Sequence, residues 1–121
     1  MSYQDDLNAL IANGYISYVT ILDPNGATYW TNNPNWTVDG PGLLGAWQSK
    51  APSVLIAGTK YSAFLNDPPE FLVAKSMAGG GTIIIAKAPN GYFFLTWTDP
   101  GSQITPTNIH GEVARMAAKF R

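Results

Sequence analysis

The chain has 121 residues and no cysteine, which excludes disulfide bonds, thiol nucleophiles and zinc sites built on cysteine. Its composition is 45% hydrophobic and 12% aromatic with a net charge of −1, so we expect one folded domain over residues 1–121. Residues 1–49 hold no Lys or Arg, and the remainder holds seven basic residues against four acidic ones. This surplus is too small for a dedicated nucleic-acid binder or for strong attraction to an anionic membrane.

The N-terminal segment "MSYQDDLNALIANG" carries two aspartates and no basic residue, which is not the pattern of a signal peptide. No apolar run approaches the roughly 20 residues needed to cross a bilayer. We therefore expect a soluble, cytoplasmic protein.

The first predicted element is a helix over about residues 2–13. Ser2 followed by Asp5 resembles a capping box, and Gly14 is a natural stop just past the end. An apolar stripe at helical spacing is formed by Tyr3, Leu7, Leu10 and Ile11.

Strands are predicted next. "YISYVTIL" and "ATYWT" flank the turn "DPNG" and predict a hairpin over residues 15–31. "PGLLGAWQSK" predicts a short helix with Leu43, Leu44 and Trp47 on one side, although its glycines lower the helix propensity. Five further strands are predicted at "PSVLIAG", "TKYSAFLN", "EFLVAKS", "GTIIIAK" and "YFFLTWTD", the last two joined through an Asn-Gly turn.

The last predicted element is an amphipathic helix that Thr105 caps and Pro106 begins. Its apolar stripe consists of Ile109, Val113, Met116 and Phe120. One flank of the stripe carries Asn108, Glu112, Arg115 and Lys119, and the other flank carries His110 and Arg121. The order of elements predicts an α+β fold, an antiparallel sheet of about six or seven strands with an amphipathic helix at each terminus packed on a sheet face.

The residues for several kinds of chemistry are missing. His110 is the only histidine, so a metal site built on several His or Cys ligands is excluded. No G-x-S-x-G motif accompanies it, and "AGGGT" lacks the Gly-Lys-Ser/Thr ending of a phosphate loop. We therefore expect neither an enzyme, nor a cofactor, nor a metal.

Several segments together resemble the profilins, a family of small actin-binding proteins. "MSYQDDLNALIANG" resembles the N-terminal helix of that family, and "ILDPNGATYW" resembles its first strand–turn–strand unit. "GTKYSAF", "AKSMAGGGTIIIAK" and "ARMAAKFR" are similar to the fourth strand, the glycine-rich turn with its flanking strand, and the final helix. The likeness runs from end to end, and the short, divergent chain would suit an archaeal member. The resemblance implies a central antiparallel sheet with both terminal helices packed on one face.

The resemblance implies that the chain binds the barbed-end face of the actin monomer, or of an archaeal actin homologue, and regulates polymerisation by sequestering or delivering subunits. In the family that surface comes from strands four to six and the exposed side of the last helix. The corresponding residues here are Lys60, Phe64, Lys75, Thr82, Ile84, His110, Glu112 and Arg115. Lys60 and Lys75 stand one per strand, so neighbouring antiparallel strands can place them on one sheet face.

The resemblance also implies an aromatic groove between the terminal helices that binds proline-rich segments. The candidate groove residues here are Tyr3, Tyr29, Trp30 and Phe120. Asp6 stands where the family usually has a tyrosine, and Lys119 or Ala117 replaces an aromatic or histidine of the last helix. We therefore expect weak or absent binding of proline-rich peptides. Phosphoinositide binding has weak support, because the basic clusters that it needs are mostly missing.

Two other readings of the pattern remain open from the residues alone. A longin- or roadblock-type scaffold that docks a small GTPase also combines a sheet of about five strands with helices. A small-molecule sensor of the PAS type would use an aromatic pocket among Trp30, Trp36 and Trp97. The longin or roadblock folds lack paired terminal helices on one face of the sheet. The PAS-type sensor requires that the three tryptophans share a cavity.

Overall fold

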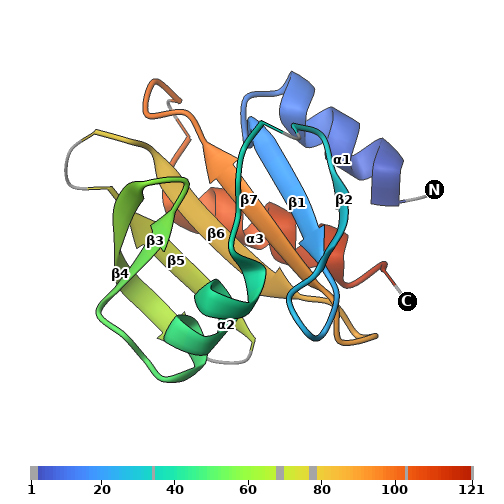
Figure 1. Cartoon of the computed structure of the whole chain (residues 1–121). Coiled ribbons are helices and arrows are strands. Elements are labelled where there is room, and N and C mark those ends of the chain that lie inside the picture. The colour runs from blue at the N-terminus through green and yellow to red at the C-terminus, as the bar shows by residue number, and fades with distance from the viewer. Residues whose placement is uncertain (1–2, 34, 68–69, 77–78, 103, 121) are drawn as a thin grey trace.

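The computed structural model describes the chain apart from residues 1–2, 34, 68–69, 77–78, 103 and 121, and apart from the side chains of Tyr3, Gln4 and Phe64. The elements in chain order are α1 (Tyr3–Ala12), β1 (Tyr18–Leu22), β2 (Thr28–Thr31), α2 (Gly40–Gln48), β3 (Ser53–Ile56), β4 (Thr59–Asp67), β5 (Phe71–Lys75), β6 (Thr82–Lys87), β7 (Phe93–Thr98) and α3 (Pro106–Ala117) (Figure 1). In this described part, seven antiparallel strands form one sheet in the order β2-β1-β7-β6-β5-β4-β3. The predicted α+β fold is confirmed.

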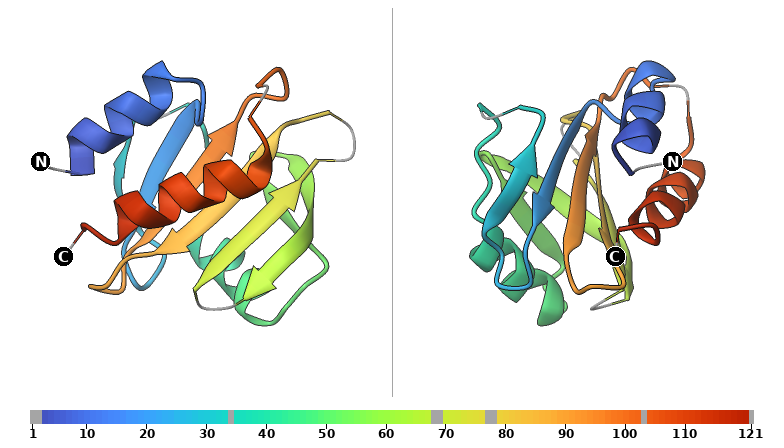
Figure 2. Two further views of the ribbon diagram at one scale, coloured as in Figure 1. Left: turned by 180° about the vertical axis from the view of Figure 1, so that it is seen from behind. Right: turned by 90° about the vertical axis from the view of Figure 1, so that its right-hand side faces the viewer.

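The sheet separates two hydrophobic clusters. Helices α1 and α3 lie side by side on one face, and α2 covers the opposite face (Figure 2). The cluster under α1 and α3 is built on residues such as Val19, Val73 and Ile84, and the cluster under α2 on Leu72, Ile83 and their neighbours. The strands β5 and β6 are therefore apolar on both sides, as expected for central strands.

Helix α3 begins and ends as its sequence predicts. The Thr105 hydroxyl accepts a hydrogen bond from the Asn108 N–H over 3.4 Å, and Pro106 occupies the first turn. Ile109, Val113 and Met116 are buried against the sheet. The capping box predicted for α1 involves Ser2, which lies outside the described residues.

Helix α2 forms despite its three glycines. The Asp39 carboxylate accepts a hydrogen bond from the Gly42 N–H over 3.2 Å and caps the first turn. The fully buried Trp47 donates its Nε1–H to the Phe71 carbonyl over 3.1 Å and meets the Phe93 ring edge-on. Tertiary packing on the sheet thus offsets a poor helix propensity.

The turn between β3 and β4 places an alanine where the backbone favours Asn or Gly. Ala57 has φ +51° and Gly58 has φ +81°, and Ile56 pairs with Thr59 on either side of them. Two positive φ angles in a two-residue hairpin loop suit Asn-Gly, because the left-handed region costs other residues roughly 1–2 kcal/mol. We expect Ala57→Asn to raise the free energy of unfolding by about 1 kcal/mol in urea denaturation. Ala27→Asn, at an exposed alanine outside the left-handed region, should change it by less than about 0.5 kcal/mol.

Candidate interaction surface

Part of the sheet face that carries α1 and α3 is left uncovered, over β3, β4 and β5 (Figure 2). Ser62 pairs with Lys75, and Lys60 lies two residues from Ser62, so both lysines project from the same face. Val73, two residues before Lys75, packs into the cluster under α1 and α3, which identifies that face. Lys60 and Lys75 are both exposed. We call this uncovered region the open face and define it by Leu55, Lys60, Ser62, Leu65, Phe71, Lys75 and His110.

Two exposed leucines on the open face were not among the residues proposed from the sequence. Leu55 pairs with Lys60 and is 67% exposed, and Leu65 pairs with Val73 and is 40% exposed. Strict alternation from Lys60 would bring residue 64 opposite Val73, but the register shifts between Ala63 and Leu65. The bulge therefore gives Leu65 the position expected of Phe64, whose side chain lies outside the described residues.

His110 joins α3 to the open face. Its ring is half-buried, and the ring centroids of His110 and Phe71 are 4.5 Å apart. Burial lowers the pKa of His110 below its usual value of 6.5, because the interior disfavours the charged ring.

The lowered pKa of His110 predicts a pH dependence of stability. Well above pH 6.5 the His110 ring is neutral in both the folded and the unfolded state, so it has no effect on stability. As the pH falls below 6.5, the unfolded chain binds a proton before the folded chain does, so stability is lost. We expect the drop in unfolding free energy between pH 7.5 and 5.5 to be smaller in His110→Gln than in the natural chain. The measurement is urea denaturation at both pH values. If the unfolding free energy fell equally in His110→Gln and in the natural chain, this assignment would be contradicted.

Two residues proposed from the resemblance are corrected by burial. Ile84 has no exposed area, because it pairs with Val73 and Thr96 beneath α3, and Thr82 is only 8% exposed at the end of β6. Ile84 belongs to the core and cannot touch a partner. Thr82 offers at most a minor contact.

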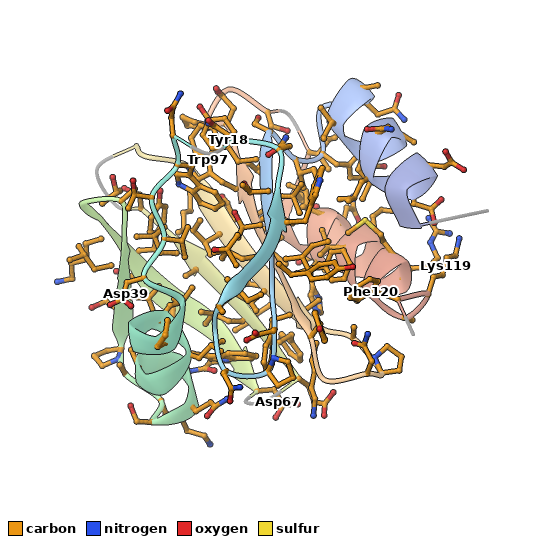
Figure 3. The ribbon with its side chains drawn as sticks, turned by 45° about the vertical axis from the view of Figure 1, so that its right-hand side comes forward. Tyr18, Asp39, Asp67, Trp97, Lys119 and Phe120 are labelled. Carbon is orange, nitrogen blue, oxygen red and sulfur yellow. The ribbon has the colours of Figure 1, made fainter. Side chains whose placement is uncertain are left out.

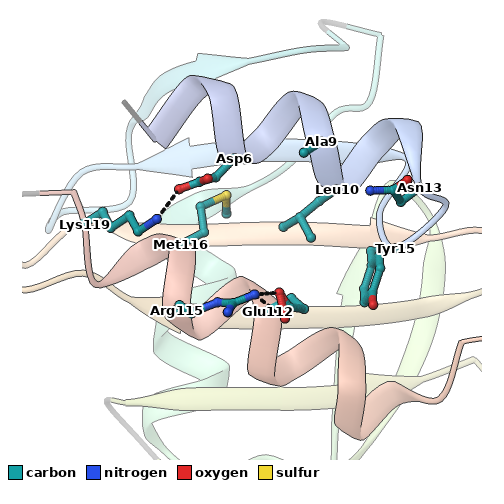
Figure 4. A pocket seen from close by; sticks show the side chains of 9 residues that line it. All are labelled: Asp6, Ala9, Leu10, Asn13, Tyr15, Glu112, Arg115, Met116 and Lys119. Carbon is teal, nitrogen blue, oxygen red and sulfur yellow. Dashed lines mark hydrogen bonds and ion pairs between the residues drawn. The ribbon is translucent and has the colours of Figure 1, made fainter. Parts of the chain in front are cut away.

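Glu112 and Arg115 lie on the other flank of α3, away from His110. They form an ion pair and line a groove of about 380 Å³ between α1 and α3 (Figure 4). At one end of this groove Lys119 Nζ lies 2.8 Å from Asp6 Oδ2 and links the two helices. The structure therefore does not bring Glu112 and Arg115 together with Lys60 and Lys75.

The candidate residues for proline-rich ligands gather at the C-terminal end of α3. Ring centroids lie 6.0 Å apart between Tyr29 and Phe120, and 5.4 Å apart between Tyr92 and Phe120. Tyr29 is 56% exposed, whereas Trp30 packs against the cluster under α1 and α3. The sequence reasoning missed Tyr92, and the side chain of Tyr3 lies outside the described residues.

The three tryptophans do not share the cavity that a PAS-type sensor would require. Trp36 and Trp97 pack against the cluster under α2, on the opposite side of the sheet from Trp30. Trp97 stacks on Tyr18 with centroids 4.7 Å apart and donates to the Gly80 carbonyl over 2.7 Å (Figure 3). These contacts explain the tryptophans by packing.

Within the described residues, no group of three or more His, Asp or Glu side chains gathers in a way that could hold a metal ion. No helix in that part of the chain has the length and apolar character to cross a membrane.

Known proteins resemble this chain along nearly its whole length, although no protein-family model matches it. Thor profilin of a Thorarchaeota archaeon is 31% identical over 105 residues, covering 84% of this chain and 79% of that protein. Odin profilin of Odinarchaeota yellowstonii is 25% identical over 117 residues, covering 96% and 97%. Among solved structures, LokiProfilin2, determined in complex with rabbit actin, superposes with a TM-score of 0.81 at 19% identity and covers 97% of this chain and 93% of its own. This chain belongs to the profilin family, with archaeal relatives.

Proposed function

We propose that this chain binds monomeric actin, or an archaeal actin homologue, through the open face and thereby regulates polymerisation. The observation that carries the proposal is that Lys60 and Lys75 project from the same uncovered sheet face, together with the exposed Leu55 and Leu65. Support also comes from the fold that the chain shares with LokiProfilin2, which was solved with rabbit actin.

The composition of the open face suits a protein partner. A stable interface buries roughly 800 Å² on each partner, and a few central apolar or aromatic anchors supply most of its energy. Leu65 and the Phe71–His110 pair are the natural anchors, since Leu65 is exposed opposite Val73 and the centroids of the two rings lie 4.5 Å apart at the border between β5 and α3. The lysines complement an acidic surface and favour rapid association.

The proposed activity is binding alone, without chemistry by the chain itself. By covering the barbed-end face of a subunit, it would block nucleation while still allowing delivery of that subunit to a filament end. Such a role places the protein in the cytoplasm with the cytoskeleton.

Proline-rich ligands would bind weakly or not at all. The Asp6–Lys119 ion pair lies next to Phe120, at the place where the family usually continues its aromatic surface. A charged pair offers no stacking surface to a polyproline helix, which leaves the exposed Tyr29 and the half-exposed Tyr92 and Phe120 as the clustered rings among the described side chains there. Phosphoinositide binding would be weaker still, given the scattered basic residues.

The test is direct titration of the chain into monomeric rabbit actin by calorimetry, paired with a fluorescence assay of spontaneous polymerisation. We expect saturable one-to-one binding and a longer lag before filaments form. Leu65→Ala should weaken binding by about tenfold, as expected for an interface anchor. Absence of binding to both rabbit actin and an archaeal actin would overturn the proposal.

A further inference from the structure

Strand β3 ends the sheet with one edge unpaired by any strand of the described chain, because only β4 neighbours it. The Ala63 N–H donates a hydrogen bond to the Pro52 carbonyl over 3.0 Å. This bond fixes which residues of β3 direct their backbone groups toward β4. In an antiparallel pair, every second residue directs its backbone groups away from the partner strand. The N–H and C=O groups of Ser53 and Leu55 therefore point toward the free edge.

A groove runs along that free edge. It has a volume of about 620 Å³, within the range of ligand-binding clefts, and separates β3 from α2 and the segment before it. The residues that matter are Ser53, Val54, Leu55, Leu43, Ala46 and Asp39. Successive strand residues face opposite sides of a sheet, so a cavity that touches three in a row must follow their backbone.

We propose that this groove binds an extended segment of a partner protein as an additional strand on β3. The segment would exchange main-chain hydrogen bonds with Ser53 and Leu55, and would place an apolar side chain against Leu43, Ala46 and Val54. This mode of recognition takes its affinity from the backbone and its selectivity from pockets for alternate side chains.

The shape and charge of the groove define the occupant. Because α2 lies beside the free edge, a narrow extended chain fits there more readily than the edge of a second folded copy. The exposed Asp39 carboxylate at the start of α2 favours a basic residue at that end of the segment. A proline-rich segment is a poor occupant, since proline lacks the N–H that the Ser53 and Leu55 carbonyls require.

The site is separate from the proposed actin function, although Leu55 and Lys60 border both regions. The test therefore contains no actin. The probe is an acetylated, amidated hexapeptide of sequence Lys-Thr-Val-Thr-Val-Thr, titrated into the whole chain. Its matched control is the same peptide with both valines N-methylated, which removes two backbone hydrogen-bond donors.

The readout is amide hydrogen exchange by NMR. With the hexapeptide at saturating millimolar concentration, we expect exchange at Ser53 and Leu55 to slow at least tenfold. Val54 and Ile56, whose amides already face β4, should change little. The N-methylated peptide and decaproline should leave all four amides unaffected.

Two pairs of variants test the location. Ala46→Trp should fill the groove and weaken hexapeptide binding at least tenfold, whereas Gln48→Trp, at an exposed position of the same helix, should not. Leu55→Pro removes an outward N–H and should abolish binding that Leu55→Ala retains. Unchanged exchange at Ser53 and Leu55 would overturn the proposal. So would protection of these amides that rises with protein concentration without peptide, since a second copy would then occupy the edge.

Discussion

Reversing both charges of the open face, with Lys60→Glu and Lys75→Glu together, is expected to weaken the binding of monomeric actin by about 10- to 100-fold. That factor corresponds to a loss of about 1.4–2.8 kcal/mol. Both lysines are exposed on one face, so the change replaces attraction to an acidic partner by repulsion without disturbing the core. Calorimetry at two salt concentrations checks the result, because the natural chain should lose affinity with added salt and the variant should lose less.

The matched control for this variant is Lys50→Glu. Lys50 is exposed just past the end of α2, on the side of the sheet opposite the open face. The substitution Lys50→Glu changes the net charge by the same amount as each substitution of the double variant. It should leave the affinity for monomeric actin within about twofold of the natural chain. If Lys50→Glu weakened binding as much per charge as the double variant, net charge rather than the open face would control association.

The largest effect on stability is expected for Trp47→Ala. Trp47 is fully buried between α2 and the sheet, and it supplies the hydrogen bond from its Nε1–H to the Phe71 carbonyl. Truncation of a buried tryptophan costs about 3–5 kcal/mol, a large share of the 5–15 kcal/mol that typical domains possess. Urea denaturation should show this loss as a lower midpoint.

Trp47→Phe separates packing from hydrogen bonding. It keeps most of the ring volume against Phe93 but leaves the Phe71 carbonyl without its donor, so we expect a loss of about 1–2 kcal/mol. Since Trp47 lies on the far side of the sheet, the folded fraction of either variant should bind actin as the natural chain does. A specific loss of actin affinity in Trp47→Phe would show that the two faces are coupled.

Much of the architecture follows from local rules in the sequence. Helix α3 could be predicted because Thr105, Pro106 and the stripe through Ile109 and Val113 agree with one another. The strands were predicted from β-branched and aromatic runs with turn residues between them. The resemblance of the ordered segments to profilins then gave the arrangement of the terminal helices, which short-range pattern alone does not determine.

The surface residues were harder to predict than the fold. Ile84 was misplaced because β6 is apolar on both faces, so its sequence does not distinguish a residue beneath α3 from one open to a partner. Glu112 and Arg115 were assigned to the same surface as His110, although the helical spacing already put them on opposite flanks of α3. Leu55 and Leu65 were missed because exposed leucines resemble core leucines in sequence, and only the pairing of β3, β4 and β5 reveals them.

The irregularity between Ala63 and Leu65 has a consequence for comparing profilins with one another. Side-chain direction in a strand alternates residue by residue, so a homologue with the same number of residues but no bulge here would place residue 64 opposite Val73 and reverse the direction of the side chains that follow. Two profilins with identical aligned residues in this strand then present different side chains to the same actin subunit. Specificity for one filament protein over another then depends on where this strand bulges, with no substitution at the contact itself.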